Sequence, residues 1–113
     1  MRQFLRSKIH KATVTGADIH YIGSVTLDSE LMERAGIGEW EKVLIVDNTN
    51  GARLETYAIV GEPGSGIVQI NGGAAHLVKP GDEVIIMTFE IAERPSGPTQ
   101  ILVDGKNRFV RNL

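Results

Sequence analysis

Cysteine is absent from this chain of 113 residues. Without cysteine the protein has no disulfides, no thiolate nucleophile and no cysteine-bound metal, and the absence fits a cytoplasmic location. No apolar run is long enough to cross a bilayer, so we expect no membrane partner. The N-terminal stretch MRQFLRSKIHK has neither an uninterrupted apolar segment nor a small-residue cleavage site, and it does not predict secretion.

A strong charge of one sign is also missing. The net charge is −2, whereas a general nucleic-acid-binding protein needs a clear basic excess, so we expect no nucleic-acid partner. Basic residues gather at the two ends of the chain, where we interpret them as solvated. Hydrophobic residues make up 42% and charged residues 23%. Together with the length, this composition predicts one globular domain over residues 1–113.

The motifs of several common sites are missing too. The three histidines are widely spaced, form no HExxH pattern and predict no metal site: His10, His20 and His76. Ser24 is not part of a GxSxG motif, and no hydrolase triad stands out. The glycine-rich segments 61–66 and 71–74 match no phosphate-binding loop. Segment 71–74 still offers backbone N–H groups to an anion, although its spacing alone favours a tight turn.

Short β-branched segments separated by turns, with thirteen glycines in all, dominate what is present. Alternating or continuous hydrophobic residues predict strands over 7–15, 17–27, 42–48, 53–60, 67–70 and 83–91, and a final hairpin over 99–112 around Asp104-Gly105. Asn50-Gly51 predicts a hairpin turn. Short helices are predicted over 28–36, capped by Asp28 or Ser29 and ended by Gly36, and over 71–78. This pattern favours a closed β-barrel with helical inserts, and a sandwich remains the alternative.

A few polar side chains share strand faces. Lys8 and His10 lie two apart, and so do Arg53, Glu55 and Tyr57, with Thr56 on the opposite face. Arginine is the preferred partner of a carboxylate, and tyrosine can donate a proton to a carbanion. Taken singly, such residues are more often solvated or packed. The residues by themselves therefore predict a barrel with a candidate site for a small acid.

Five segments closely resemble the pyruvoyl-dependent aspartate 1-decarboxylases. They occur in the family's order and with compatible spacing, and the resemblance covers about residues 4–90. The segments are SKIHKATVT, ADIHYIGSVTLD, NGARLETYAI, GEPGSG and NGGAAHLVKPGDEVII. Each string alone is weak evidence, whereas five in register are specific.

The resemblance implies a mainly β, single-domain double-psi β-barrel that assembles as a homotetramer with sites between subunits. The family is made as an inactive proenzyme that cuts its own backbone at a Gly-Ser bond, here between Gly23 and Ser24. The products would be a β chain of residues 1–23 and an α chain of residues 24–113. The sequence does not tell whether a maturation helper is needed.

Self-cleavage would convert Ser24 into a covalently bound pyruvoyl group, with no metal and no pyridoxal phosphate. In the family this ketone forms a Schiff base with L-aspartate and accepts the electrons released with carbon dioxide. The product is β-alanine, a precursor in pantothenate biosynthesis.

The resemblance also implies residue roles. Arg53 and Lys8 match carboxylate-binding residues, Tyr57 the proton donor and Thr56 the residue that polarises the scissile carbonyl. Further pocket-lining positions are His10, Tyr21, Asn71, Gly73 and Ala74. Through this match, contact of segment 71–74 with an anion becomes the favoured interpretation.

Some positions depart from the family pattern. Val46 stands where some members have tryptophan, Leu54 replaces a frequent aromatic, and Gly73 replaces a common alanine. These departures bear on pocket shape more than on reaction type. Two alternatives stay open: a non-catalytic barrel used as a binding module, and a pyruvoyl decarboxylase of another small amino acid, for which Val46 is the only hint. The tail from Arg94 has no assigned role, and its hairpin is a candidate for packing on a neighbouring subunit.

Overall fold

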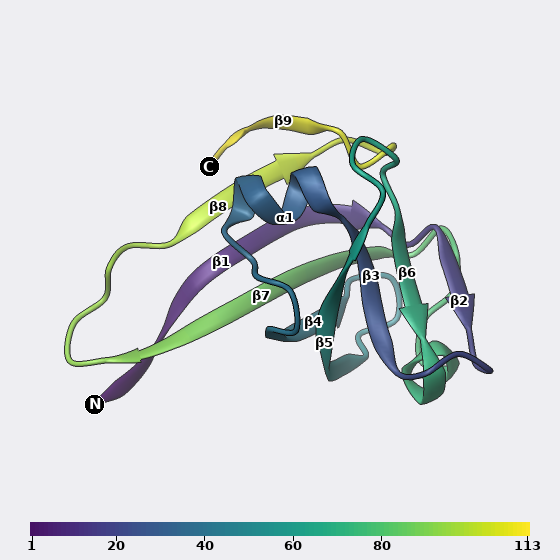
Figure 1. Cartoon of the computed structure of the whole chain (residues 1–113), viewed down its shortest axis with the longest axis horizontal. Coiled ribbons are helices and arrows are strands. Elements are labelled where there is room, and N and C mark those ends of the chain that lie inside the picture. Colours follow the sequence, from purple (N-terminus) through teal and green to yellow (C-terminus); the bar gives the residue numbers. More distant parts are fainter.

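A computed structural model describes residues 1–113, and Figure 1 shows the arrangement of its elements. Strands predominate, with one short α-helix and one 3₁₀ turn. The strands are β1 (Arg2–Thr13), β2 (Gly16–Asp18), β3 (Ser24–Asp28), β4 (Lys42–Asp47), β5 (Arg53–Gly61), β6 (Val68–Asn71), β7 (Glu83–Ala92), β8 (Thr99–Val103) and β9 (Phe109–Asn112). The helices are α1 (Ser29–Ala35) and η1 (Gly72–His76). The mainly β, single-domain prediction is confirmed.

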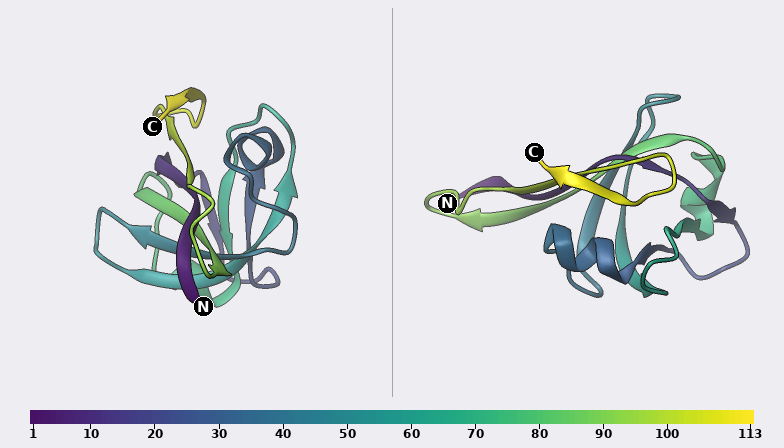
Figure 2. Two further views of the ribbon diagram at one scale, coloured as in Figure 1. Left: turned by 90° about the vertical axis from the view of Figure 1, so that its left-hand side faces the viewer. Right: turned by 90° about the horizontal axis from the view of Figure 1, so that it is seen from above.

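The strands form one curled sheet in the order β2-β6-β3-β5-β4-β7-β1-β8-β9 (Figure 2). Strand pairing does not close the barrel, because β2 and β9 at the two ends do not pair with each other. Contacts from loops bridge the opening instead. Thr15 donates its N–H to the carbonyl of Val68 at 2.8 Å, and the Asn107 amide donates to the carbonyls of Thr13 and Gly66 at 2.8 and 2.7 Å.

One row of side chains defines the inner face of the sheet. Pairing aligns five buried residues across five neighbouring strands: Ile101, Ile9, Ile86, Ile45 and Leu54. Because side chains alternate along a strand, the next row points outward, and it contains Lys8, Met87, Leu44 and Glu55. The alternation thus sets which polar residues share the outer face.

The predicted helix over 28–36 is confirmed, including its ends. The Asp28 carboxylate accepts the N–H of Glu30 as an N-cap, and Gly36 ends the helix at a φ of +76°. Asp28 also accepts the N–H groups of Gly64 and Gly66 at 3.0 and 2.9 Å, so one carboxylate holds both the helix start and the glycine-rich turn. The helix predicted over 71–78 is confirmed as the single turn η1.

The strand predicted over 17–27 is wrong, because the chain leaves β2 after Asp18 and begins β3 only at Ser24. Both short strands flank the same end of β6: Asp18 pairs with Asn71 on one side and Ser24 pairs with it on the other. Residues 19–23 form the loop that crosses this end, and the Asp18 carboxylate accepts the N–H of His20 at 2.9 Å at its start. The alternation of hydrophobic residues gave a wrong strand prediction here, because Ile19 and Tyr21 are exposed in the loop and do not form a buried strand face.

The tail after residue 94 belongs to this chain's own sheet. The predicted hairpin is confirmed, with β8 antiparallel to β9, and β8 also pairs in parallel with β1. Ile101 and Val103 of β8 are buried in the core, whereas β9 is mostly exposed, so packing of this hairpin on a neighbouring subunit stays a prediction. β1 and β7 continue beyond the barrel as a paired arm that ends near the N-terminus (Figures 1 and 2). No helix of the structure is long and apolar enough to span a membrane.

Candidate active site

Ser24, the first residue of β3, is buried to 2% exposure. Its Oγ accepts a hydrogen bond of 2.9 Å from Nδ2 of Asn71, its cross-strand partner on β6. On its donor side, Ser24 Oγ lies 3.5 Å from the carbonyl of Ile22, a long contact. The hydroxyl is therefore held by a neutral amide, without a histidine or carboxylate as partner.

The Asn71 amide is oriented by two further polar side chains that the sequence analysis missed. Gln69 Nε2 donates to Asn71 Oδ1 at 2.9 Å, and Asn71 Nδ2 also donates to Thr26 Oγ1 at 3.1 Å. Gln69 and Thr26 are cross-strand partners, two residues along the strands from the Asn71–Ser24 pair and on the same face. The signal in the sequence was the two-residue spacing of each polar pair, which puts both members on one strand face.

Thr56 and Tyr57 reach this site through the register of β5. Val25 of β3 pairs in parallel with Ala58, so continuing that register places Tyr57 beside Ser24 and Thr56 beside Gly23. By strand alternation Tyr57 shares the face of Ser24, whereas Thr56 shares that of the buried Ala58. A row therefore runs from Asn71 through Ser24 to Tyr57, across three strands.

Trp40 is a second residue that the sequence analysis missed. Its ring stacks on Tyr57 with 6.0 Å between centroids and 22° between planes. Trp40 is the only tryptophan of the chain and is 69% exposed, at a φ of +69°. A large exposed indole held in this conformation restricts the Tyr57 ring and extends the apolar surface beside it.

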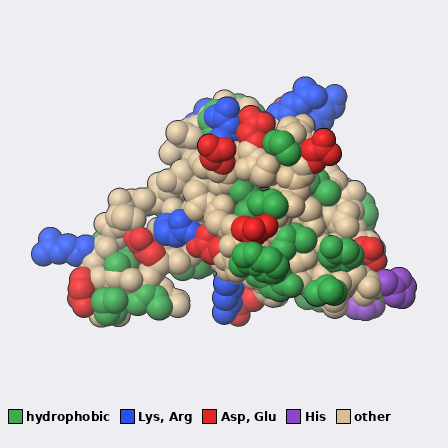
Figure 3. All heavy atoms as spheres, viewed as in Figure 1, with side chains coloured by type: hydrophobic (Ala, Val, Ile, Leu, Met, Phe, Trp, Pro, Cys, Tyr) green, Lys and Arg blue, Asp and Glu red, His purple; other side chains and the backbone are tan.

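The remaining predicted pocket residues lie in the loop before Ser24 or on η1, and they differ in how exposed they are. Tyr21 is in the loop before the Gly23–Ser24 bond and is 52% exposed. Gly73 is exposed on η1, and Ala74 is half-buried against the core. Figure 3 shows histidine side chains at the corner of the molecule formed by the β2–β3 loop and η1, with hydrophobic side chains along the adjoining surface. The buried Ser24 hydroxyl thus directly follows an exposed loop that carries apolar side chains.

The predicted carboxylate-binding residues lie elsewhere in the same chain. Arg53 begins β5, four residues before Tyr57, which corresponds to about 13 Å along a strand. Lys8 lies on β1, which is separated from β5 by β7 and β4, or about 14 Å across the sheet. Arg53 and Lys8 share the outer face with each other and with His10, and Arg53 pairs with Val46. Within one chain Lys8 is therefore separated from Ser24 across the sheet, and Arg53 is offset from the Ser24 row along β5.

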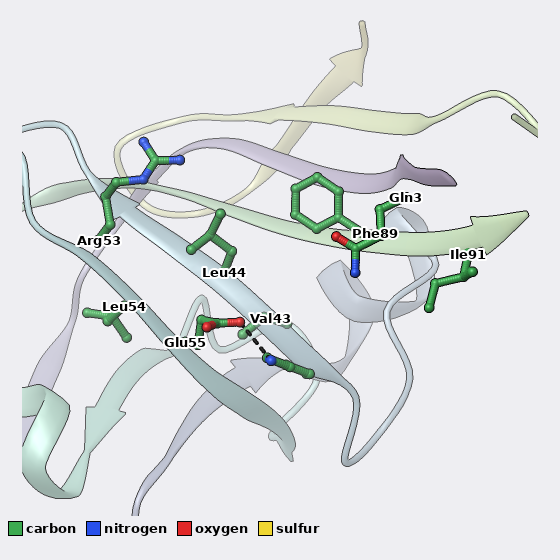
Figure 4. A pocket seen from close by; sticks show the side chains of 9 residues that line it. Gln3, Val43, Leu44, Arg53, Leu54, Glu55, Phe89 and Ile91 are labelled. Carbon is green, nitrogen blue, oxygen red and sulfur yellow. Dashed lines mark ion pairs between the residues drawn. The ribbon is translucent and has the colours of Figure 1, made fainter. Parts of the chain in front are cut away.

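Arg53 instead lines a groove of about 600 Å³ on the outer face (Figure 4). Arg53 stands near one end, and the exposed side chains of Phe89 and Ile91 lie at the other. Lys42 and Glu55 form an ion pair of 2.8 Å along its side. The groove is a surface with positive groups and apolar walls, and it adjoins the Ser24 row at Lys42, the cross-strand partner of Tyr57.

His10 has a neutral imidazole as its favoured form. Burial lowers its pKa, and the nearby charges of Lys8 and Lys11 lower it further, against an opposing effect of Glu83. Its Nδ1 is buried without a hydrogen-bond partner. A neutral ring beside Lys8 adds polarity to this face without adding to its positive charge.

A family model described as aspartate decarboxylase matches residues 1–110. The chain belongs to the aspartate decarboxylase family. The match spans nearly the whole domain, so it includes both the Ser24 row and the outer-face residues. It supports decarboxylation of aspartate as the activity and agrees with the mainly β, barrel-like fold. No three His, Cys, Asp or Glu side chains gather as a metal-binding group.

Proposed function

We propose that this protein is a self-processing, pyruvoyl-dependent decarboxylase that converts L-aspartate into β-alanine and carbon dioxide, supplying β-alanine for pantothenate biosynthesis. The observation that carries the proposal is the buried Ser24 hydroxyl, which Asn71 holds directly after Gly23 at the end of an exposed loop. Membership of the aspartate decarboxylase family supports the substrate.

Self-cleavage begins with addition of Ser24 Oγ to the carbonyl carbon of Gly23. The new C–O bond replaces the Gly23–Ser24 amide bond, and the hydroxyl proton ends on the freed amine of Ser24. Removal of the Ser24 Cα proton then breaks the Cβ–O ester bond and releases the carboxylate of Gly23. Hydrolysis of the resulting dehydroalanine liberates ammonia and leaves the pyruvoyl group at residue 24.

The surroundings of Ser24 fit this conversion. The Asn71 amide fixes the hydroxyl beside the scissile bond, and burial excludes water that would compete as a nucleophile. Thr56, in register with Gly23, is the proposed donor to the scissile carbonyl. A pyruvoyl ketone supplies an electron sink for the pair left behind when the substrate carboxylate departs. Tyr57, in register with residue 24 and stacked on Trp40, is the proposed proton donor.

The substrate-binding cations are proposed to come from a second copy of the chain. By strand geometry the backbone of Lys8 lies about 19 Å across the sheet from Ser24, too far for Lys8 to bind a small acid held at residue 24 of the same chain. The backbone of Arg53 lies about 13 Å along β5 from Tyr57. The outer face that carries them also exposes Phe89 and Ile91. Packing of this face in a homotetramer would cover these apolar groups and complete the site.

Intact-protein mass spectrometry tests the proposal. The wild-type chain should give fragments 1–23 and 24–113, the larger with a carbonyl that borohydride reduces. Ser24→Ala should fold but remain whole and inactive, whereas Ser96→Ala, a change in an exposed loop, should be cut like the wild type.

Two outcomes would contradict the proposal. A folded Ser24→Ala variant that still decarboxylates aspartate would exclude the pyruvoyl mechanism. A wild-type chain that stays whole after prolonged warming, with and without host-cell extract, would exclude cleavage both alone and with a helper. Assays with other small amino acids test the alternative substrate class.

A further inference from the structure

Gly72, the first residue of η1, lies directly against the backbone that precedes Ser24. A Cβ on Gly72 would stand 2.7 Å from the Cα of Gly23 and 2.9 Å from its N, and 3.2 Å from the carbonyl oxygen of Tyr21. All three atoms belong to the main chain, so no side-chain rotation could relieve the overlap. The φ of Gly72 is +75°, which also disfavours any residue with a Cβ.

The neighbouring glycines have no such constraint. A Cβ on Gly73 would meet nothing within 4 Å, and the same holds for Gly23. Neither residue has a positive φ. Of the glycines around the scissile bond, Gly72 alone is required by the close approach of another segment.

Asn71 and Gly72 therefore contact the two sides of one peptide bond. Asn71 binds the side chain of Ser24, and Gly72 supports the main chain of Gly23. Since the two residues are adjacent, a shift of the loop away from Gly72 would change the angle and distance between Ser24 Oγ and the Gly23 carbonyl. The hydroxyl, held by Asn71 in the rigid pair of β3 and β6, would not follow it.

We propose that Gly72 is a positioning residue for self-cleavage: its bare Cα allows the Gly23 backbone to seat where Ser24 Oγ can attack the Gly23 carbonyl. This inference rests on the proposed function. Gly72 contributes no group to the reaction and acts through the position of Gly23. Its effect belongs to the first step, in which the ester forms, because that step alone depends on the alignment of hydroxyl and carbonyl.

The matched pair Gly72→Ala and Gly73→Ala tests this assignment, since each adds one methyl group to adjacent residues of η1. Precursor chains are purified and the appearance of fragment 24–113 is followed by intact mass. Gly73→Ala should be cut at the wild-type rate. Gly72→Ala should be cut about a hundredfold more slowly, the loss that a displacement of about 1 Å causes in a positioned reaction.

Hydroxylamine at neutral pH provides a readout that a general loss of stability would not move, because it cleaves the ester and leaves an ordinary amide intact. The ester is scored by the mass of the 1–23 hydroxamate, which distinguishes it from cleavage at Asn50-Gly51 or Asn71-Gly72. Folded Gly72→Ala should contain less hydroxylamine-sensitive ester than Gly73→Ala. Unfolding midpoints and circular dichroism are measured with both changes in the Ser24→Ala background, where no cleavage intervenes. Normal ester formation followed by slow release of the fragments would overturn the assignment to the first step.

Gly72→Asn separates the effect of the positive φ from the effect of the close backbone contact. Asparagine tolerates a positive φ but still carries a Cβ that would overlap with Gly23. It also keeps the test decisive if Gly72→Ala does not fold. The proposal expects folded Gly72→Asn to be cut slowly. If the wild type is cut and either folded Gly72 variant is cut as fast, the proposed function stands and the role of Gly72 is refuted. A wild-type chain that remains whole counts against the proposed function itself.

Discussion

At the scale of single residues, Ser24 is distinguished by what holds it. Its hydroxyl is bound by a neutral amide whose own oxygen is fixed by Gln69, and no charged side chain contacts it. This environment differs from that of a serine hydrolase, where an imidazole takes the proton. An uncharged, water-poor setting suits a serine that reacts once with its own backbone.

The separation of Arg53 from Ser24 predicts that a substitution of Arg53 affects binding of aspartate but not self-cleavage. Arg53→Ala should lower kcat/KM for aspartate by about 10- to 100-fold, the value of a lost hydrogen bond to a charged group. Arg53→Lys should recover part of this loss, because it keeps the charge but loses the bidentate geometry. Cleavage at Gly23–Ser24 should stay close to the wild-type rate, since Arg53 lies four residues along β5 from Tyr57.

Steady-state kinetics on fully processed enzyme, with cleavage followed separately by mass, makes this comparison. Unchanged kcat/KM in Arg53→Ala would remove its role as the carboxylate-binding residue.

At the scale of elements, loops connect the site to the rest of the domain. The hairpin loop after β4 holds the segment that follows η1: Asn50 Nδ2 donates to the carbonyl of Leu77 at 2.8 Å. In the same loop the buried Asp47 accepts the N–H groups of Thr49 and Asn50 through Oδ1. Its Oδ2 has no donor as partner and faces the carboxylate of Asp82.

This carboxyl pair gives stability a defined dependence on pH. Burial raises the pKa of Asp47, and its hydrogen bond with Asp82 raises the pKa further, while the hydrogen bond lowers the pKa of Asp82. The pair therefore holds a shared proton to a higher pH than an isolated aspartate does. The contribution of Asp47 is fully present below its unfolded pKa and is lost as the pH rises through its higher folded pKa. Asp82 acts in the opposite direction, and its contribution is lost at acid pH.

Asp47→Asn should remove the loss on the alkaline side. Asparagine keeps Oδ1 as the acceptor and turns a permanent N–H donor toward Asp82, so this variant should gain stability over the unchanged chain as the pH rises through the raised pKa of Asp47. Urea unfolding across pH, in the Ser24→Ala background, measures the difference.

Asp104→Asn is the matched control, because backbone N–H groups of Arg108 and Lys106 lower the pKa of Asp104. That substitution should cost stability at neutral pH. Parallel profiles for Asp47→Asn and the unchanged chain would contradict the shared proton.

At the scale of the whole molecule, Ser24 and the proposed carboxylate-binding residue Lys8 lie on different parts of one curled sheet. The Ser24 row lies at the β6–β3–β5 side, whereas Lys8 and His10 are on β1, near the other end of the strand order. A well-packed barrel does not bend to join them, so the proposed site requires association of copies.

Complementation between two inactive variants tests this association. Ser24→Ala and Arg53→Ala chains, co-expressed in equal amounts, should form mixed assemblies in which about a quarter of the sites combine an intact Ser24 with an intact neighbouring Arg53. The rate of aspartate decarboxylation should return to about a quarter of the wild-type rate. Sedimentation should show a tetramer for each variant alone. Inactive mixed tetramers would show that Arg53 does not act across the interface.

The sequence by itself determined the local features and the family. Asp28 and Gly36 define α1 because a carboxylate caps free N–H groups and glycine tolerates a positive φ. The two-residue alternation correctly separated Thr56 from Arg53 and Tyr57, since it depends only on strand geometry. The five strings in register, including those around Gly23-Ser24 and Asn71, indicated the aspartate decarboxylase family, which the family model confirms.

Only the tertiary structure decided how the site is built. The loop over residues 19–23 exists because two short strands flank the end of β6, a non-local pairing that no local pattern contains. The same pairing brings Gly72 against Gly23 and Asn71 against Ser24, across almost fifty positions of sequence. Strand order likewise separates Lys8 from Ser24, whereas Arg53 lies on the neighbouring strand β5 and is separated from the Ser24 row only along that strand. Sequence specified the chemical groups, whereas long-range strand pairing fixed the distances between them.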